Sequence, residues 1–136
     1  MRVITDKDLM EAAEAARLRS YSPYSHFCVG AALLGESGTI YTGCNIENAA
    51  FSPTNCAERT AFFKAVSEGE RSFAAIAITG GREGAAPSFC APCGVCRQVM
   101  LEFCKGDFRV ILGNSSALQV TTLAELTPYA FDAETL

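Results

Sequence analysis

The first twenty residues carry apolar side chains at the spacing of a helix. From Thr5 or Asp6 to about Ser20, the apolar positions fall roughly on one stripe, with acidic residues early and arginines late. The stripe consists of Leu9, Ala12, Ala13, Ala16 and Leu18. Because the stretch SPYS (22–25) then breaks the pattern, we expect a first helix that ends near Ser20.

The next segments have the patterns of a hairpin and a second helix. The apolar runs FCVGAALL (27–34) and TIYTGCN (39–45) lie on either side of a Ser-Gly pair, which predicts two strands joined by a turn. Over residues 56–68, apolar side chains recur on one helical face, and Gly69 supplies a stop. We therefore expect the hairpin to be followed directly by a helix.

Strand and helix patterns alternate in the second half of the chain. The expected strands are 73–79, 108–113 and 118–122, and the expected helices are 94–104 and part of 123–131. Such alternation is typical of a sheet covered by helices on both faces. We therefore predict an α/β fold, a three-layer α-β-α sandwich around a mixed, mostly parallel sheet.

Composition narrows the class of protein. The chain has 136 residues, 49% of them hydrophobic, which suits a single domain over 1–136 whose core needs no disulfides. Its net charge of -4, with no cluster of Lys or Arg, offers no surface for a nucleic-acid backbone. No apolar run is long enough for a membrane span, and charges at residues 6–8 interrupt a secretory signal. We expect a cytoplasmic protein with a small-molecule partner.

The cysteines indicate metal binding. There are seven, an odd number with no export signal, so a disulfide framework is not expected. In the run CAPCGVC, a helix that begins after Cys93 would place Cys93 and Cys96 on one face of its first turn, as in zinc thiolate pairs. We interpret these two as metal ligands. Three other cysteines are interpreted as packing thiols: Cys28, Cys44 and Cys104.

The stretch PTNCAERTAFF (53–63) offers a third ligand, Cys56, two residues before Glu58. Inside one helix, residues two apart point about 200° away from each other, so they could not share a target. They converge if Cys56 stands at the helix start, where the backbone is not yet helical. Two helix N-termini would then stabilise the thiolates, leaving a fourth position for water and Glu58 as general acid and base.

Two motifs carry a family resemblance. CAE and PCGVC resemble the Cys/His-x-Glu and Pro-Cys-x-x-Cys signature of the zinc deaminases that act on nucleobases. Beyond them, PYSHFCVGAAL, GCNIENAAF and CAERTAFFKAVSEG are similar to the free-nucleoside cytidine deaminases over most of the chain. The resemblance implies zinc-dependent hydrolytic deamination of cytidine and deoxycytidine to uridine and deoxyuridine, in pyrimidine salvage. His26 is the only histidine, which excludes the His-x-Glu version.

The resemblance also implies the roles of residues around the metal. One Zn²⁺ per subunit would be held by Cys56, Cys93 and Cys96. Glu58 would carry protons from water to the ring and to the leaving amine. Arg59, directly after the glutamate, would hydrogen-bond the thiolates and offset their negative charge.

Further residues are expected to contact the nucleoside. The resemblance implies that Asn45 and Glu47 hold the ribose hydroxyls, that Phe27 packs near the nucleoside, and that the backbone at Ala57 meets the pyrimidine edge. Phe51 stands where a tyrosine is usual in the family, so it retains the aromatic packing without the hydroxyl. From the residues alone, Asn45 and Glu47 alternate after a strand, so their side chains lie on the same side of an extended segment. Phe27 alone is interpreted as a core residue.

Near the end of the chain, TPYAFDAETL places Phe131 where the family has a ring that covers the base in a neighbouring subunit's site. The resemblance therefore implies a homotetramer whose sites are shared between subunits. From the residues alone, Phe131 packs equally well on its own core, because apolar residues near a last helix usually pack locally.

Three other functions stay open at this point. The first is a deaminase of a modified cytosine nucleoside, which would differ in its pocket and share the zinc site. The second is a structural zinc or cluster site that includes Cys90, since this residue extends the run to Cys-x-x-Cys-x-x-Cys. That arrangement leaves Glu58 without a role. The third, a deaminase that edits nucleic acid, is disfavoured by the acidic charge balance.

Overall fold

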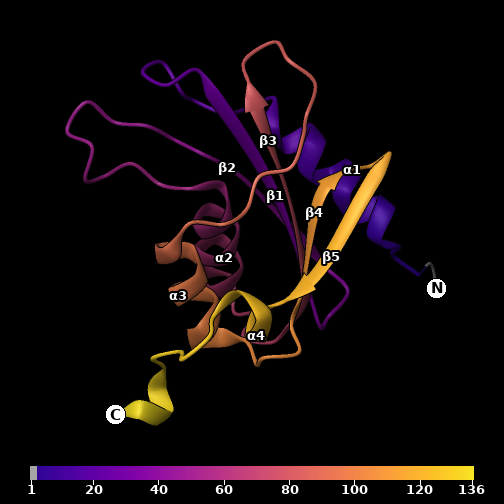
Figure 1. The fold of residues 1–136 in the computed structure, drawn as a ribbon, viewed down its shortest axis with the longest axis vertical. Helices are drawn as coiled ribbons and strands as arrows, with labels where there is room; N and C mark the ends of the chain where they lie inside the picture. Colours follow the sequence, from indigo (N-terminus) through magenta and orange to yellow (C-terminus); the bar gives the residue numbers. More distant parts are fainter. Residues whose placement is uncertain (1–2) are drawn as a thin grey trace.

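The computed structural model describes residues 3–136 and shows a twisted five-stranded sheet with helices on both faces (Figure 1). In chain order the elements are α1 (Asp6–Arg17), β1 (Phe27–Gly35), β2 (Ile40–Cys44), α2 (Ala57–Ser67), β3 (Phe73–Arg82), α3 (Gly94–Phe103), β4 (Arg109–Asn114), β5 (Ala117–Thr122), α4 (Leu123–Leu126) and a final 3-10 turn (Ala133–Thr135). Each helix and strand expected from the sequence is present. The predicted end of the first helix is wrong, because Leu18 caps the helix and is 81% exposed instead of extending the apolar stripe.

The strand order is β2-β1-β3-β4-β5. The prediction of an α/β fold with a mixed sheet is confirmed, but the expectation of a mostly parallel sheet is wrong. Within the described residues only β3 and β4 pair in parallel, while the other three neighbouring pairs are antiparallel. The reason is that β1–β2 and β4–β5 are hairpins, so the chain contains a single strand-helix-strand crossover between adjacent parallel strands, through α3.

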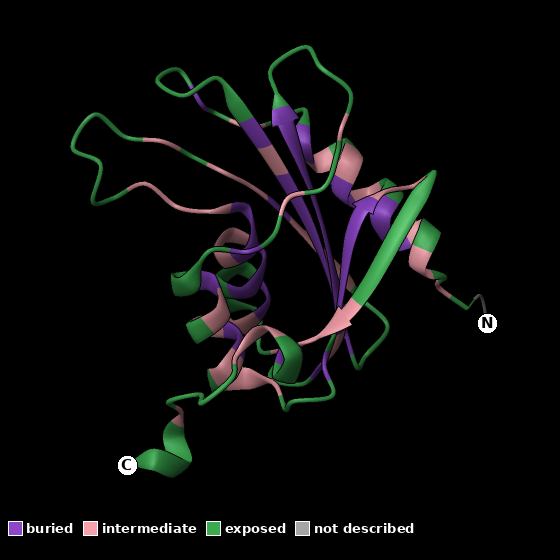
Figure 2. Ribbon diagram, in the orientation of Figure 1, coloured by how far each residue is buried: buried purple, intermediate pink, exposed green. Residues whose placement is uncertain are grey.

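The two faces of the sheet have different cores. On one face α1 packs on small residues of β1 and β3, among them Ala32, Ala75 and Ala77. On the other face α2 and α3 pack around larger side chains, including Phe62 and Met100. Figure 2 shows the central strands buried between these layers, while most of β5 is exposed at the edge of the sheet. Three layers are therefore present, as predicted.

Two glycines allow the helices to lie close to the sheet. A Cβ atom at Gly30 would stand 2.0 Å from the carbonyl oxygen of Ala13 in α1. A Cβ atom at Gly43 in β2 would stand 2.4 Å from the carbonyl oxygen of Ala57 and 2.6 Å from the amide nitrogen of Ala61. Both distances are far below a van der Waals contact, so the position of the first turns of α2 depends on the glycine in β2.

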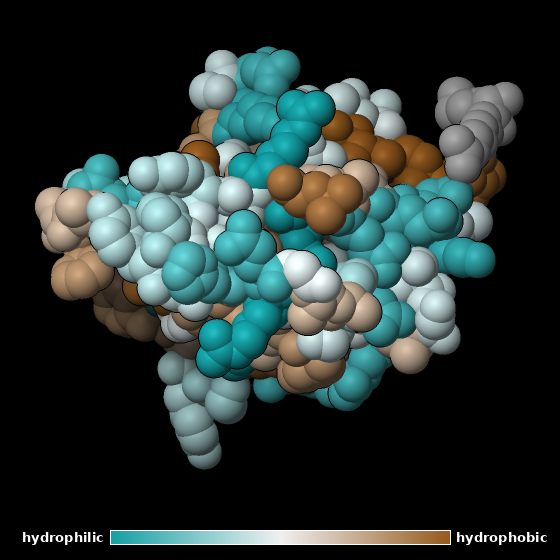
Figure 3. All heavy atoms as spheres, turned by 90° about the horizontal axis from the view of Figure 1, so that it is seen from above, coloured by the Kyte–Doolittle hydropathy of each residue, from teal (hydrophilic) through white to brown (hydrophobic). Residues whose placement is uncertain are grey.

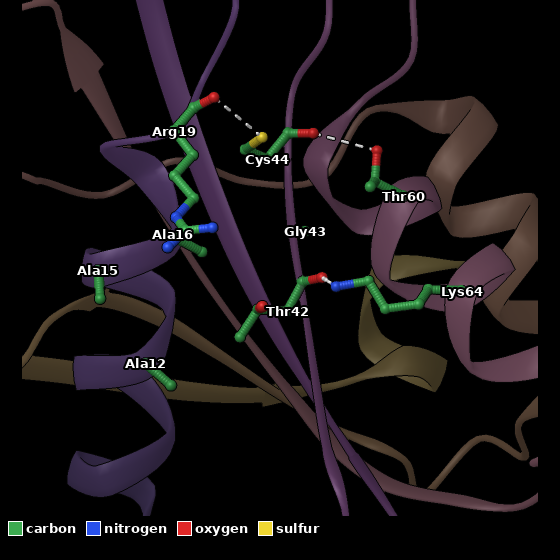
Figure 4. A pocket seen from close by; sticks show the side chains of 9 residues that line it. All are labelled: Ala12, Ala15, Ala16, Arg19, Thr42, Gly43, Cys44, Thr60 and Lys64. Carbon is green, nitrogen blue, oxygen red and sulfur yellow. Dashed lines mark hydrogen bonds between the residues drawn. The ribbon is translucent and has the colours of Figure 1, made fainter. Parts of the chain in front are cut away.

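The outer edge of β2 is covered by side chains of α2. Lys64 Nζ donates to the carbonyl of Thr42, and the Thr60 hydroxyl donates to the carbonyl of Cys44 at 3.0 Å. These bonds lie on the α2 side of a groove of about 470 Å³ between α1, β2 and α2 (Figure 4). Because these side chains lie across the outer edge of β2, they hinder the addition of another strand there.

Three loops gather at the upper end of the molecule in Figure 1, over residues 18–26, 45–56 and 83–93. Seen from this end, the surface is mostly hydrophilic with separate apolar patches (Figure 3). The exposed apolar side chains of these loops include Tyr24, Phe51 and Phe89. Within residues 3–136 no helix combines the length and apolar character that a membrane crossing requires.

Candidate active site

The starts of α2 and α3 meet at three cysteines. Cys56 is the residue before α2 and Cys93 the residue before α3, and both have extended backbone conformations. Neither side chain caps its own helix. Cys96, one turn into α3, is buried. The Sγ atom of Cys93 lies 3.7 Å from that of Cys56 and 3.6 Å from that of Cys96, so all three thiols converge.

The spacing of these thiols fits zinc. Zinc–sulfur bonds of about 2.3 Å in a tetrahedral site place two sulfurs about 3.8 Å apart. The three Sγ atoms, of Cys56, Cys93 and Cys96, all lie within 4.8 Å of one another. Cys90 does not belong to this group in the part of the chain that the structure describes. Three protein ligands would leave one tetrahedral position open, which is the arrangement of a catalytic zinc site.

Charge at the cluster is balanced by Arg59. A hydrogen bond from the Cys96 thiol, and then one from Arg59, lower the pKa of Cys56 to about 5. The Arg59 bond runs from Nη2 to Cys56 Sγ over 3.3 Å, and it raises the pKa of Arg59 in turn. Arg59 Nε is buried without a partner among the described residues. A cation directed at thiolates makes them weaker donors, which preserves the acidity of a metal that they bind.

Glu58 is a buried carboxyl beside this cluster. It is the second residue of α2, and only 4% of it is exposed. Burial raises its pKa to about 7, and the negative charge of Cys56 acts in the same direction. A carboxyl group with this pKa exchanges protons readily at neutral pH, which is the requirement for a general acid and base.

Phe27 and Cys90 meet over a glycine of β3. A Cβ atom at Gly80 would lie 3.1 Å from Phe27 Cε1 and 3.1 Å from Cys90 Sγ, so both side chains pack against the bare backbone there. Burial, followed by the negative charges of Glu58 and Cys56, raises the pKa of the Cys90 thiol to about 11. Phe27 is 39% exposed, so its interpretation as a core residue is wrong.

Asn45 and Glu47 both bond to the loop that precedes β1. Asn45 Oδ1 accepts from the Ser20 hydroxyl at 2.5 Å, and Asn45 Nδ2 donates to the carbonyl of Phe27 at 2.8 Å. Glu47 Oε1 accepts from the amides of Tyr24 and Ser25, and Oε2 accepts from the Ser25 hydroxyl. The bond from this hydroxyl is the main cause that lowers the pKa of Glu47.

Glu47 also lines a cavity with Phe51. The cavity has a volume of about 310 Å³ and is lined by Tyr24, Ser25, Glu47, Phe51 and Thr54. Phe51 is 74% exposed, and its ring meets that of Tyr24 edge-on at 6.5 Å between centroids. Phe51 has a left-handed backbone conformation, with φ of 62°, which turns the chain between Asn48 and Thr54.

Comparison with known proteins places this geometry in a family. Residues 3–113 match the family model of the cytidine and deoxycytidylate deaminase zinc-binding region. The chain belongs to this family. The resemblance identified from the motifs is therefore confirmed, and the cysteine cluster fits the zinc site that the family model describes.

Relatives of known identity cover nearly the whole chain. A cytidine deaminase of Sporosarcina psychrophila is 56% identical over 129 residues, which are 94% of this chain and 92% of the relative. One from Halalkalibacterium halodurans is 51% identical, over 93% of each chain. The crystal structure of a cytidine deaminase from Burkholderia pseudomallei matches with a TM-score of 0.85 and 48% identity, over 93% of this chain and 99% of that one.

Phe131, the last of the aromatic residues expected at the site, lies on a segment that projects from the protein. Phe131 is 56% exposed, and its carbonyl accepts a hydrogen bond of 2.8 Å from Gln98 Nε2 of α3. The C-terminal end extends away from the helix layer (Figure 1). Phe131 is not among the residues that line the cavity with Glu47 and Phe51.

Sequence reasoning missed the residues that hold Asn45 and Glu47. Ser20 and Ser25 supply donors to their side chains, and the segment around Tyr21 pairs with the segment around Ile46. This pairing joins segments about 25 residues apart, so no local spacing marks the serines. Their position in the loop just before a predicted strand is the only signal that the sequence offers.

Proposed function

We propose that this protein catalyses the hydrolytic deamination of cytidine and deoxycytidine to uridine and deoxyuridine, with release of ammonia. The observation that carries the proposal is the buried Glu58 carboxyl beside the cluster of Cys56, Cys93 and Cys96, in a member of this family. We assign the reaction to pyrimidine salvage in the cytoplasm, with residues 1–136 acting as one domain.

The three cysteines would hold one Zn²⁺ per subunit. When bound, zinc lowers the pKa of water, so that a nucleophile for C4 of the pyrimidine is available at neutral pH. The residues around the metal then set its charge. Arg59, bonded to Cys56 Sγ, would offset the negative charge of the thiolates.

Glu58 would move the protons of the reaction. As a base it would accept the proton of the attacking water, and as an acid it would protonate N3, which makes C4 more electrophilic. It would then take the proton of the hydroxyl group added at C4, which becomes the carbonyl of the product, and pass it to the amine, so that ammonia leaves as a neutral molecule. A carboxyl buried against a metal site suits these tasks, because its pKa lies near neutrality.

The nucleoside would lie between the cluster and the loops. We assign the sugar hydroxyls to Asn45 and Glu47, the faces of the nucleoside to Phe27 and Phe51, and the pyrimidine edge to the backbone at Ala57. Phe27 supports this placement, since its backbone bonds to Asn45 while its ring packs beside Cys90, near Glu58.

We further propose a homotetramer in which Phe131 completes the site of a neighbouring subunit. The exposed aromatic residues of the C-terminal segment support this, since Tyr129 is fully exposed and Phe131 more than half exposed. A closed symmetric assembly gives each such segment a fixed place on another copy.

An assay of ammonia release from a panel of cytosine compounds tests the function. Cytidine and deoxycytidine should be converted with about one zinc per chain, while cytosine in single-stranded DNA or RNA should not react. Rates on nucleosides should vary little with salt, because no basic surface contributes to binding. Zinc content without nucleoside turnover, or a preference for nucleic acid, would overturn the proposal.

A further inference from the structure

The orientation of the Asn45 amide is fixed by two backbone groups. The amide N–H of Val29 can only donate, and it lies 2.9 Å from Oδ1. The carbonyl of Phe27 can only accept, and it lies 2.8 Å from Nδ2. Exchanging the oxygen and nitrogen of the side chain would therefore place two donors together and two acceptors together. The NH₂ group of Asn45 is held on the exposed side of the amide.

Ser20 completes this arrangement. Its hydroxyl donates to Asn45 Oδ1 over 2.5 Å, so both acceptor positions of that oxygen are occupied. Ser20 lies three residues after the end of α1. Backbone bonds hold the segment in place: the Tyr21 amide donates to the Asn45 carbonyl, and the Glu47 amide donates to the Tyr21 carbonyl. The hydroxyl of Ser20 therefore reaches the amide from a fixed position.

The remaining hydrogen-bonding capacity of the pair is small. Asn45 keeps one N–H that has no partner in the described chain. Glu47 accepts three bonds, from Tyr24 and twice from Ser25. A carboxylate has about four acceptor positions, so one is left, on Oε2. One donor and one acceptor are the complement of an alcohol group, which both accepts and donates.

We propose that Ser20 is a positioning residue for the sugar of the nucleoside. By occupying Oδ1, it leaves Asn45 as a donor only, directed at a sugar hydroxyl. It also keeps water and substrate hydroxyls from bonding to Oδ1, so that the remaining N–H is the only hydrogen-bonding group of the side chain that the described residues leave free. This inference rests on the proposed function, specifically on sugar binding by Asn45 and Glu47. It adds a residue that does not itself touch the substrate.

The test measures kcat and KM of the zinc-loaded enzyme for cytidine and 2′,3′-dideoxycytidine. Loss of one hydrogen bond should raise the KM of Ser20→Ala for cytidine about three- to tenfold, with kcat within about twofold of the wild type. The KM for dideoxycytidine should not change, because that sugar lacks the 2′- and 3′-hydroxyls and keeps only the 5′-hydroxyl. Ser20→Thr, which keeps a hydroxyl, should restore most of the affinity.

Ser22→Ala is the matched control. It removes a hydroxyl from the same segment, but that hydroxyl contacts Cys28 Sγ and the Ser20 hydroxyl, not Asn45. Its KM values should stay close to wild type for both substrates. Equal KM changes for both substrates in Ser20→Ala, or no change for cytidine, would overturn the role of Ser20. If the wild-type enzyme itself does not distinguish the two substrates, sugar binding by Asn45 and Glu47 fails, and the inference fails with it.

Discussion

The cysteine cluster and the pair Asn45–Glu47 differ in how far the chain satisfies their polar groups. At the starts of α2 and α3, three thiols crowd within 4.8 Å, and Arg59 Nε has no partner in the described residues. The side chains of Asn45 and Glu47, in contrast, are each held by three hydrogen bonds. A bound metal would complete the cluster, whereas the pair is already held within the chain. Changes at the cluster should therefore abolish activity, and changes that alter only positioning should reduce it by degrees.

The largest effect is expected at the metal ligands. Serine at Cys56, Cys93 or Cys96 should remove the zinc and with it all measurable turnover. The two remaining thiolates would bind the ion too weakly, because the open fourth position contributes no protein ligand. Zinc content per chain by elemental analysis is the measurement. Cys90→Ser is the matched control and should keep its zinc, since Cys90 lies outside the cluster. An empty site in Cys90→Ser would favour a structural metal site instead.

A somewhat smaller loss is expected for Glu58→Gln. The amide is nearly isosteric and is not a ligand, so the fold and the zinc should remain while kcat falls by about 10²–10⁴. Steady-state kinetics together with zinc analysis distinguishes this loss of kcat, with zinc retained, from the loss caused by removing a metal ligand. Turnover near wild type in this variant would remove Glu58 from the mechanism.

Arg59→Gln should have a milder effect, because Arg59 acts on the thiolates and not on the reacting atoms. A loss of about 10- to 100-fold in activity or zinc affinity is expected. Competition with a chelator measures the affinity, and kcat measures the activity. If neither the zinc affinity nor kcat changes, the bond to Cys56 Sγ has no role in metal binding or catalysis.

The smallest effect is expected for Phe131→Ala, which would lose about five- to tenfold in kcat/KM through the missing ring contact. This variant also tests whether a residue of a second chain contributes to the site. Coexpressed with Glu58→Ala, it should give more activity than the sum of both parents, because some sites would combine an intact ring and an intact carboxylate from different chains. If mixed oligomers form without this gain, Phe131 does not act across an interface.

The parts of the fold that were predicted correctly depend on local patterns. Helical stripes and apolar runs located all the helices and strands, and the short motifs located the cysteine cluster, because its geometry follows from the start of a helix. The expectation of a mostly parallel sheet was wrong, because the order in which strands pair depends on the path of the chain through α2 and α3, which no local pattern shows. The serines that hold Asn45 and Glu47 could not be predicted, since their contacts form only after the segments have paired.

The close contact at Gly43 links a residue of β2 to the cysteine cluster on the other side of the first turn of α2. Since a Cβ atom there would meet the backbone of Ala57 and Ala61, any larger residue must shift the turn that carries Cys56 and Glu58. If positions were ranked only by their distance from the proposed nucleoside site, Gly43 would be expected to tolerate substitution. Because of this close contact, we expect Gly43 to be as sensitive to substitution as the metal ligands. Mutations behind α2 would then impair the enzyme as much as mutations within its pocket.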